Sequence, residues 1–290
     1  ITAISAPAVS GCAVPENATV SVQVKNNMQV PLANIPIRYR LNSGSWVQEV
    51  IASLAAGATT TYHFTQKANL TATGSYLLET EVLAAGDNIE GNNRMEQQLL
   101  IHPAITALPY LQDFESGPAG FLATGQNSSW THGNPASWYI KNAASGTKAW
   151  KTTLTGSYNA REKSYLYTPC FNISGMSAPV LSFALAYQLE DCRGSGVVCD
   201  AAWMEYSLDG QTWTKLGAFG QGQNWYDYEA AQVWMRSDQP GWRQARISLP
   251  QHEGTIRFRY VLESDDGVNR DGLAIDDFSI FNEGPLPIDW

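Results

Sequence analysis

The sequence predicts an all-β protein built from two β-sandwiches, an Ig-like sandwich followed by a larger jelly roll. Apolar and polar residues alternate over short runs, which is the period of a strand with one buried face. Clusters of Gly, Asn, Ser and Pro separate these runs, as turns separate antiparallel strands. The chain has 290 residues, and domains usually hold roughly 100–200 residues, so we expect two domains.

The first domain is predicted to span residues 1–103 as an Ig-like β-sandwich. Five alternating runs support it: 18–26, 35–42, 59–66, 75–83 and 95–103. The stretch 47–54 instead places its apolar residues at helical spacing. Its β-branched residues and the Gly-containing turn that follows favour a strand over a single turn of helix. Short strands joined by turns are typical of an antiparallel sandwich.

The second domain is predicted to span residues 104–283, after a Pro-bearing connector at 102–110. Its strand-like runs include 148–156, 163–172, 179–190, 201–210, 213–219, 242–250 and 255–264. The segment 228–236 is the one stretch in which we expect a short helix. Strands in this number, joined by long loops, are typical of a jelly roll or a lectin-like double sheet.

The last predicted strand, "GLAIDDFSIF" at residues 272–281, carries two carboxylates among apolar side chains. Because side chains alternate along a strand, Asp276 and Asp277 are expected on opposite faces. Both faces are mainly apolar, and burying a carboxylate without a partner is costly. The sequence therefore predicts that a cation or a set of donors meets at least one of these aspartates.

Composition and motifs argue against several classes of function. The chain holds 18 Lys and Arg against 27 Asp and Glu, and no basic stripe interleaved with aromatics, so we expect no nucleic acid. The sequence contains no run of 18 apolar residues, so we expect no membrane-spanning helix. The sequence lacks HExxH, GxSxG and a phosphate-binding Gly-rich loop. It also lacks the closely spaced strand carboxylates of a jelly-roll glycosidase, so we expect no catalytic activity.

Two of the four cysteines are spaced to staple a loop. Cys192 and Cys199 bracket "RGSGVV" between two strand-like runs, which favours a disulfide and an oxidising, extracellular setting. Zinc is the alternative, but it needs two further Cys or His ligands, and none is adjacent. Cys12 and Cys170 have no evident partner and are expected as buried free thiols.

Tryptophan is abundant, with ten residues in the chain. The loop "GQGQNWYDYEAAQVW" is the predicted recognition platform, with Trp225, Tyr226 and Tyr228 as its ligand-binding residues. Exposed Trp and Tyr rings of this kind stack on sugar rings, whereas buried aromatic rings dominate sandwich cores. Three other residues lie in strands with core periodicity: Trp150, Trp203 and Trp213.

Several stretches of the second domain resemble one family. "LPYLQDFES", "KSYLYTPCFNISG", "MEYSLDGQTW" and "DGLAIDDFSIF" are similar to the MAM-like jelly-roll modules of secreted Bacteroidetes proteins and to gingipain-type cleaved adhesin modules. The likeness covers most of residues 108–282. The segment "SGCAVPENATVSVQVKN" resembles the Ig-like, adhesion-related modules that often precede them. The final "PLPIDW" resembles the first strand of the sorting module of type IX secretion cargo, so residues 284–290 are expected to begin a truncated following module.

The resemblance implies a calcium ion shared by the first and last strands of the second domain. Asp113 and Glu115 would supply oxygens from the first strand, and Asp276 or Asp277 from the last. A further loop corresponds to ligands in such modules, through Asn142 and Ser145. Calcium takes 6–8 oxygen ligands, which this set could help to fill. The alternative is that the carboxylates accept hydrogen bonds from turn amides. The acidic loop 263–272 lacks EF-hand spacing and is expected to be a solvated turn.

The sequence therefore predicts a non-catalytic, calcium-stabilised adhesion or targeting module of a secreted or cell-surface protein. Its expected partners are a glycan or protein ligand at the cell surface and other domains of the same chain, the parent being an adhesin, a protease or a glycoside hydrolase. Two other hypotheses remain: a carbohydrate-active hydrolase on a jelly-roll fold, and a spacer that sets the distance of another domain from the surface.

Overall fold

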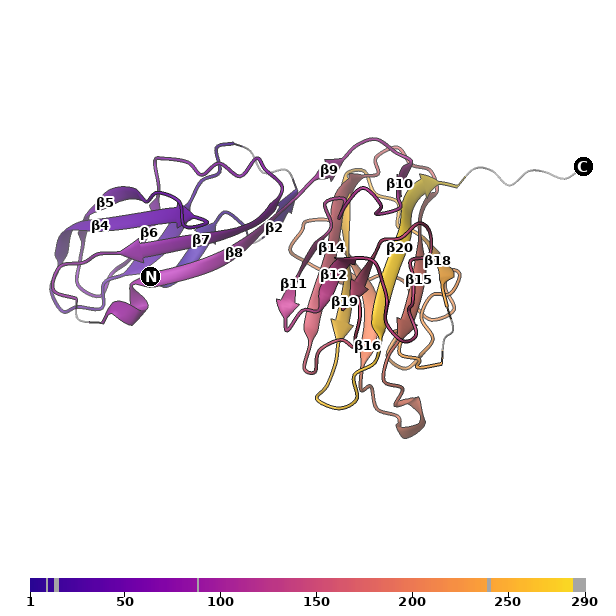
Figure 1. Cartoon of the computed structure of the whole chain (residues 1–290). Helices are drawn as coiled ribbons and strands as arrows, with labels where there is room; N and C mark the ends of the chain where they lie inside the picture. The colour runs from indigo at the N-terminus through magenta and orange to yellow at the C-terminus, as the bar shows by residue number, and fades with distance from the viewer. Residues whose placement is uncertain (9, 13–15, 88, 239–240, 284–290) are drawn as a thin grey trace, which may run out of the picture. The chain divides into compact units, whose positions relative to one another are not determined.

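The structure of the chain is a computed structural model, which describes all residues except 9, 13–15, 88, 239–240 and 284–290. Strands form in both halves of the chain. The chain divides into two compact units, Ile1–Pro103 and Ala104–Trp290. Over the described residues, the regular elements are strands β1–β20 and two short 3-10 helices, η1 and η2 (Figure 1). The predicted all-β class is therefore confirmed. The expected module at residues 284–290 lies outside the described residues.

The first unit is a two-sheet sandwich. Its three-stranded sheet has the order β1-β3-β6, and its five-stranded sheet has the order β2-β8-β7-β4-β5. The elements are β1 (Ala3–Ala6), β2 (Ser10–Cys12), β3 (Ser21–Lys25), β4 (Leu32–Leu41), β5 (Val47–Leu54), β6 (Thr59–His63), β7 (Gly74–Val82), η1 (Glu90–Asn92) and β8 (Arg94–His102). Val22 of β3 packs in one core with Ile37 of β4 and Leu78 of β7. The strand expected at 47–54 is confirmed.

The second unit is a larger sandwich of two six-stranded sheets. One has the order β12-β13-β20-β15-β18, with β10 also paired to β20. The other has the order β11-β14-β19-β16-β17, with β9 also paired to β14. The elements are β9 (Ala104–Ile105), β10 (Tyr110–Gln112), β11 (Leu122–Gln126), β12 (Trp130–Gly133), β13 (Ala149–Thr152), β14 (Lys163–Asn172), β15 (Pro179–Gln188), η2 (Arg193–Ser195), β16 (Ala201–Ser207), β17 (Thr214–Lys215), β18 (Arg243–Ser248), β19 (Thr255–Glu263) and β20 (Gly272–Asn282).

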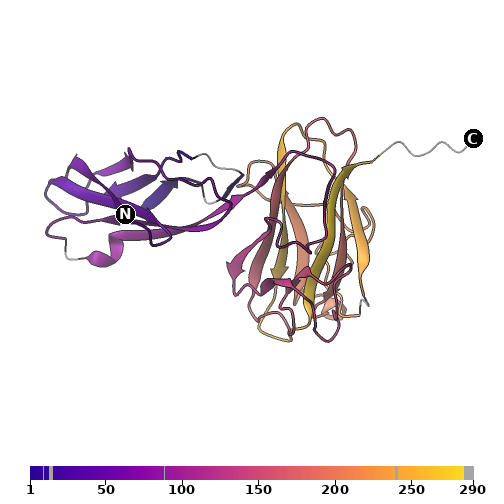
Figure 2. The same cartoon turned by 45° about the horizontal axis from the view of Figure 1, so that its top comes forward.

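The two sheets of the second unit face each other (Figure 2), and aromatic rings fill the core between them. Phe171 of β14 stacks on Phe278 of β20, with ring centroids 5.7 Å apart. Phe183 of β15 meets Tyr260 of β19 edge to face at 5.1 Å. Offset and edge-to-face pairs of this kind add to the free energy of burial. The core therefore fixes β20 rigidly against both its own sheet and the opposite one.

The last strand, β20, contains a β-bulge at its two aspartates. Its register against β15 shifts between Ser182 and Ala184, and Asp277 has a φ of 46°. Asp is one of the few residues other than glycine that adopt this left-handed conformation. A bulge inserts one extra residue, which reverses the alternation of side chains beyond it. The expectation that Asp276 and Asp277 lie on opposite faces is therefore wrong.

The bulge keeps both halves of β20 in register with the core. The buried side chains on its inner face are Leu273, Ile275, Phe278 and Ile280. Both aspartates reach the same residue on the outer side, since Ser145 donates its backbone N–H to Asp276 and its hydroxyl to Asp277. The carboxylates thus avoid the apolar interior.

Two other expectations fail. The helix expected at 228–236 is a tight turn closed by a bridge between Tyr228 and Val233. Cys12 and Cys170, expected as free thiols, are both disulfide-bonded. Cys192 and Cys199 are joined by a disulfide, with their Cα atoms 5.8 Å apart, so the expected staple is present.

The bulge predicts a sharp preference at position 277. Asp277→Asn keeps a side chain that tolerates left-handed φ and can accept the Ser145 hydroxyl, so it should be nearly neutral. Asp277→Val places a β-branched residue there and should lower the free energy of unfolding by about 1–2 kcal/mol or more. Urea unfolding of the two variants measures the difference. Equal stability of the Asn and Val variants would contradict the bulge.

Candidate functional site

A long loop joins β12 to β13 and covers the outer face of the sheet that contains β20 (Figure 1). This β12–β13 loop spans residues 134–148 and contains no strand or helix of its own. Irregular loops of this length are uncommon in compact domains and are usually functional or disordered. Buried or half-buried carboxylates hold its backbone at three places, so the loop has a defined shape.

Asp271 anchors the first half of the β12–β13 loop. It precedes β20 and is 6% exposed. Its Oδ2 accepts the Ser137 hydroxyl at 2.7 Å and the backbone N–H of Ile140 at 2.9 Å, and it also accepts the N–H of Tyr139. Hydrogen bonds to a charged acceptor are stronger than neutral ones. The expectation that the whole 263–272 loop is a solvated turn is wrong at this residue.

The bulge residues anchor the second half of the loop. Asp276 is fully buried, and its Oδ2 accepts the backbone N–H groups of Ala144 at 2.9 Å and Ser145 at 3.1 Å. The Ser145 hydroxyl donates to Asp277 Oδ1 at 2.7 Å. Burial raises the pKa of Asp276 to about 6, and the amide hydrogen bonds act in the opposite direction. Each carboxylate thus exchanges water for fixed donors of the loop.

Glu115 holds the end of the loop. Its Oε1 accepts the backbone N–H groups of Thr147 at 2.8 Å and Lys148 at 2.6 Å, which lower its pKa. Gly146 lies directly against this carboxylate with a φ of 53°, and a Cβ there would come within 2.5 Å of Glu115 Cδ. Only glycine therefore lets the loop turn tightly enough to present both amides to Glu115.

The underside of the loop is apolar. Ile140 packs with Ala186 of β15 and Ala274 of β20, and Trp242 covers this cluster. The Trp242 indole N–H donates to the backbone oxygen of Asn142 at 2.9 Å. The loop therefore joins the sheet through both buried apolar contacts and hydrogen bonds.

The upper side of the loop presents two aromatic rings to solvent. Trp138 is 82% exposed and Tyr139 is 49% exposed. No ring contact or hydrogen bond holds the Trp138 side chain among the described residues. A hollow of about 50 Å³ lies beside Tyr139 and Trp242. A tryptophan presented on a fixed backbone without a partner points to an interaction surface, because it leaves a large apolar ring in water.

A buried lysine lies beneath the first anchor. Lys151 of β13 is fully buried, and its ammonium donates to the backbone oxygens of Thr152 at 2.9 Å, Thr153 at 2.7 Å and Asp271 at 2.5 Å. Burial lowers the pKa of Lys151 to about 8, while the Asp271 charge acts against this shift. The lysine thus ties β13 to the residue that holds the exposed rings.

The residues expected to bind calcium converge in part. Glu115, Asp276 and Asp277 all contact the loop between residues 143 and 148. Asp113 is exposed and accepts the backbone N–H of Glu115 at 3.2 Å. Asn142 is also exposed, and its side-chain amide donates to the backbone oxygen of its neighbour in the chain.

The arrangement of these oxygens is that of amide acceptors. Among the described residues, two other groups bring three Asp, Glu, His or Cys ligand atoms within 4.8 Å of one another, and both contain Glu190. One group adds Asp200 and Asp265, and the other adds the disulfide-bonded Cys192 and Cys199. The calcium site stays a prediction. The amide-bound alternative describes the contacts that the carboxylates make in this structure.

The aromatic platform expected in the 220s loop is wrong. Trp225 and Tyr226 are 2% and 5% exposed and lie in the core, where their polar atoms both donate to the backbone oxygen of Leu216 at 2.8 Å. Tyr228 is half-buried against a small apolar cluster that contains Val233. The buried rings of Trp225 and Tyr226 therefore have no face open to a ligand, whereas the half-buried Tyr228 stays a predicted ligand contact.

The sequence predicts core positions for three other tryptophans, and one of these predictions is confirmed. Trp150 is buried in the core. Trp203 and Trp213 are only partly buried, and both hold cations over their rings: Lys215 over Trp203 at 4.9 Å and Arg259 over Trp213 at 4.2 Å. Sequence reasoning also missed Trp138, Tyr139 and Asp271. The signal available was an aromatic pair inside a Gly-, Asn- and Ser-rich stretch.

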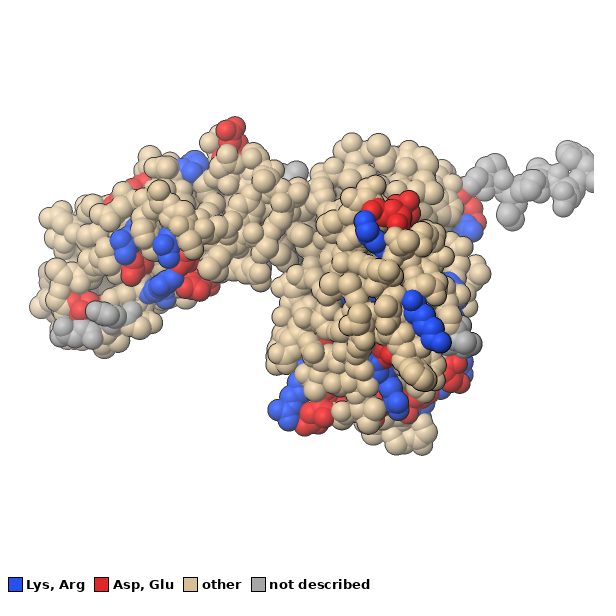
Figure 3. Space-filling model, viewed as in Figure 1, with Lys and Arg blue, Asp and Glu red and all other residues tan. Residues whose placement is uncertain are grey.

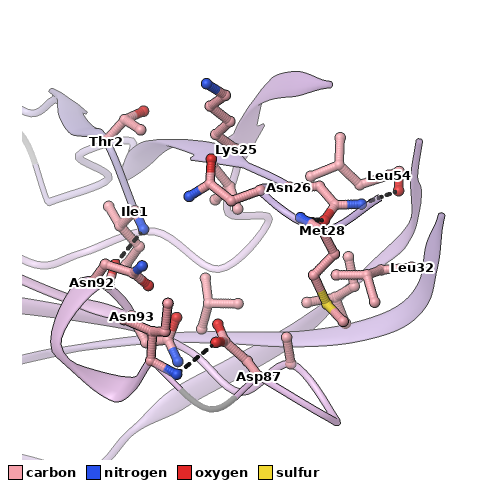
Figure 4. A pocket seen from close by; sticks show the side chains of 16 residues that line it. Ile1, Thr2, Lys25, Asn26, Met28, Leu32, Leu54, Asp87, Asn92 and Asn93 are labelled. Atoms are coloured by element: carbon pink, nitrogen blue, oxygen red, sulfur yellow. Dashed lines mark hydrogen bonds between the residues drawn. The ribbon is translucent and has the colours of Figure 1, made fainter. Parts of the chain in front are cut away.

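The first unit contains a hollow of about 270 Å³ between its strands (Figure 4). Polar groups that line this hollow form hydrogen bonds with the backbone. The Asn26 side-chain amide donates to the backbone oxygens of Val30 at 2.9 Å and Leu54 at 3.1 Å. The amino group of Ile1 at its edge donates to the Asn92 oxygen at 2.7 Å. These contacts stabilise turns, so we place the functional site in the second unit.

The chain matches no protein-family model. A sequence relative is Bacillopeptidase F of Bacillus subtilis strain 168, which is 30% identical over 179 residues. The match covers 61% of this chain and 11% of the relative, so the chain spans only a small part of that protein's length.

Three solved structures are similar to parts of the chain. TmCBM61 in complex with β-1,4-galactotriose has a TM-score of 0.40 and 15% identity, covering 61% of this chain and 100% of that one. The K1 cleaved adhesin domain of Lys-gingipain from Porphyromonas gingivalis W83 has a TM-score of 0.36 and 16% identity, with 61% and 100% covered. The CBM22-1 xylan-binding domain of Paenibacillus barcinonensis Xyn10C has a TM-score of 0.33 and 16% identity, with 60% and 95% covered. At these scores the likeness places no constraint on the site.

The buried lysine predicts a pH dependence of stability. Its pKa falls from 10.5 to about 8 on folding, so the unfolded chain binds the proton more tightly between these values. The free energy of unfolding should therefore rise with pH in this window, by up to about 1.4 kcal/mol per pH unit from this group. Thermal melts of the wild type and of Lys151→Met measure the slope, which the variant should lack. Lys141→Met removes an exposed lysine of the neighbouring β12–β13 loop; this control should keep the slope. Parallel slopes in all three proteins would contradict the buried amine.

Proposed function

We propose that this chain is a non-catalytic carbohydrate-binding part of a larger secreted protein, and that the β12–β13 loop carries the binding surface. The observation that carries the proposal is Trp138, which is 82% exposed on a backbone held by Asp271 and Asp276. A pure spacer has no need of such a residue.

The chemistry of the loop suits a sugar ring. One face of a sugar ring is lined by C–H groups and packs on an aromatic ring, while its hydroxyl edge needs hydrogen-bond partners. Trp138 and Tyr139 supply the aromatic surface, and the exposed Lys141 and Asn142 supply polar groups beside it. The anchored backbone leaves little loop entropy to lose on binding, which favours affinity.

The surface charge is compatible with a neutral ligand. The view in Figure 3 shows acidic and basic side chains in small mixed groups, with large uncharged areas between them. The net charge of −9 disfavours strongly acidic ligands at long range. A neutral glycan avoids this repulsion.

A hydrolase is the weaker hypothesis at this loop. A glycosidase places two carboxylates roughly 5–10 Å apart with room for a sugar and water between them. Here Asp271 and Asp276 are buried, and their oxygens accept loop amides. Carboxylates engaged in this way hold the backbone and cannot act on a substrate.

The proposed setting is extracellular. Disulfides persist in oxidising compartments, and the described cysteines are all oxidised. A membrane-crossing helix is absent from the part of the chain that the structure describes. The 30% identity to a segment of Bacillopeptidase F supports a parent protein with a peptidase domain elsewhere in its chain.

Affinity electrophoresis against neutral polysaccharides, including β-1,4-galactan and xylan, tests the proposed function. At least one of them should retard the wild type, and Trp138→Ala should weaken the retention by about tenfold or more, as loss of a central aromatic anchor does. Phe219→Ala removes another exposed ring of the second unit and is the matched control, which should bind as the wild type does. Absence of retention on all neutral polysaccharides would refute carbohydrate binding. Equal retention of the Trp138 variant would refute the site.

Calcium is the second part of the proposal. The carboxylates of Glu115, Asp276 and Asp277 are hard oxygen donors of the type calcium takes. The Lys148 ammonium donates to the backbone oxygen of Glu115 at 2.8 Å. A bound ion would add to the amide anchors of the loop and stabilise the folded unit by mass action.

Chelation tests the ion. EDTA should lower the melting temperature of the second unit by several degrees, taking about 2–4 °C per kcal/mol. Glu115→Gln should weaken this response, while Asp266→Asn, whose exposed carboxylate pairs with Arg161, should keep it. An unchanged melting temperature in EDTA would contradict the calcium site. The hydrogen bonds from the loop amides would then be the only contacts that hold the loop to these carboxylates.

A further inference from the structure

The small hollow beside Tyr139 and Trp242 lies at the edge of the proposed carbohydrate surface. Its volume is about 50 Å³, whereas sites that enclose a small molecule have about 300–1,000 Å³. A cavity of about 150 Å³ holds the six carbons of benzene, so this hollow has room for about two heavy atoms. A whole sugar ring therefore stays outside on the loop surface, and only a substituent of that ring can enter.

Three apolar side chains line the hollow. Ile140 and Ala186 are 5% and 3% exposed and belong to the apolar cluster beneath the loop. Trp242 packs against this cluster and forms another wall. The half-exposed ring of Tyr139 stands at the opening. A substituent that enters beside Tyr139 therefore meets carbon atoms of three different elements of the fold.

Polar atoms of these walls already have partners within the protein. The backbone N–H of Ile140 donates to Asp271 at 2.9 Å, and its backbone oxygen accepts the Ser137 hydroxyl at 3.1 Å. The Trp242 indole N–H donates to the backbone oxygen of Asn142 at 2.9 Å. A hydroxyl group that entered the hollow would lose water without gaining these atoms as partners, which is costly. A methyl group loses no hydrogen bond and gains from the burial.

Two exposed polar side chains stand at the rim of the hollow. Lys141 and Asn142 both line it and both are exposed. The Lys141 ammonium can only donate hydrogen bonds, whereas the Asn142 side-chain oxygen accepts them. The Asn142 side-chain N–H donates to the backbone oxygen of Ala143 at 2.6 Å, and no donor to its side-chain oxygen is found among the described residues. One donor and one acceptor therefore lie where a substituent would enter.

Given the carbohydrate surface proposed above, on which this assignment rests, we propose that the hollow takes the methyl end of an N-acetyl group. The ligand is then a neutral chain of N-acetylated amino sugars. A sugar ring packs on the exposed rings of Trp138 and Tyr139, and its acetamido group projects sideways into the hollow. The methyl group contacts the apolar walls. At the rim, the amide oxygen accepts from Lys141 and the amide N–H donates to Asn142, a donor that an O-acetyl group lacks.

The experiment compares three β-1,4-linked hexamers, of N-acetylglucosamine, N-formylglucosamine and glucose, by calorimetric titration of the full chain. The N-formyl hexamer keeps the amide and lacks only the methyl group. The N-acetyl hexamer should bind about tenfold or more tighter than either of the others, as one extra carbon does in an apolar pocket. Equal or tighter binding of the N-formyl or the glucose hexamer, or no binding of the N-acetyl hexamer, would overturn the proposed ligand class.

Variants of the wall and the rim test the hollow itself. Ala186→Val fills the space and should bring the N-acetyl and N-formyl hexamers to equal affinity. Lys141→Ala removes the rim donor from an exposed position that carries no risk to folding, and it should weaken binding of the N-acetyl hexamer by about threefold or more. Lys25→Ala, an exposed lysine of the first unit, is the matched control and should bind as the wild type does. Full preference for the N-acetyl hexamer in both Ala186→Val and Lys141→Ala would overturn the hollow.

Two outcomes separate the ligand class from the proposed function. Retention on another neutral polysaccharide that depends on Trp138, without any preference for N-acetyl groups, would overturn the ligand class and leave the carbohydrate surface in place. Absence of retention on every polysaccharide and of binding by all three hexamers would overturn both.

Discussion

The carboxylate of Asp276, buried beneath the β12–β13 loop and bound to its amides, is the interaction on which the rest of the second unit depends. It exists because Asp277 adopts a left-handed conformation and inserts one extra residue into β20. Without the bulge, strict alternation would turn one of two adjacent carboxylates into the aromatic core. With it, the strand keeps its apolar face inward on both sides of the bulge and presents both acids to the loop.

The loop in turn links stability to recognition. Six of its backbone N–H groups are accepted by three carboxylates, those of Asp271, Asp276 and Glu115. None of these acids touches solvent-exposed Trp138, yet they fix the backbone that presents it.

The sequence predicts the strands well because alternation and turn residues are local signals. The expected run 163–172 coincides with β14, and the last strand is found at 272–282.

The sequence did not predict the bulge, because the bulge depends on the φ of one residue, and a period-2 pattern carries no such information. The strand at 201–207 has apolar residues on both faces, so the pattern could not decide that Trp203 is only partly buried. The 220s loop looked exposed because it is rich in Gly, Gln and Asn, but Trp225 and Tyr226 pack inward against strand residues. Trp138 was missed because its exposure depends on hydrogen bonds between the loop amides and a buried carboxylate far along the chain, Asp271. A local pattern in the sequence does not reveal such contacts.

Amide hydrogen exchange in the β12–β13 loop tests the central claim most directly. Amides of exposed loops normally exchange rapidly, whereas hydrogen-bonded amides exchange only when the structure opens. The account predicts slow exchange at Ile140, Ala144 and Ser145, and fast exchange of the last two alone in Asp276→Ala. Fast exchange at all three amides in the wild type would show that the carboxylates do not hold the loop, and the rigid presentation of Trp138 would then be contradicted.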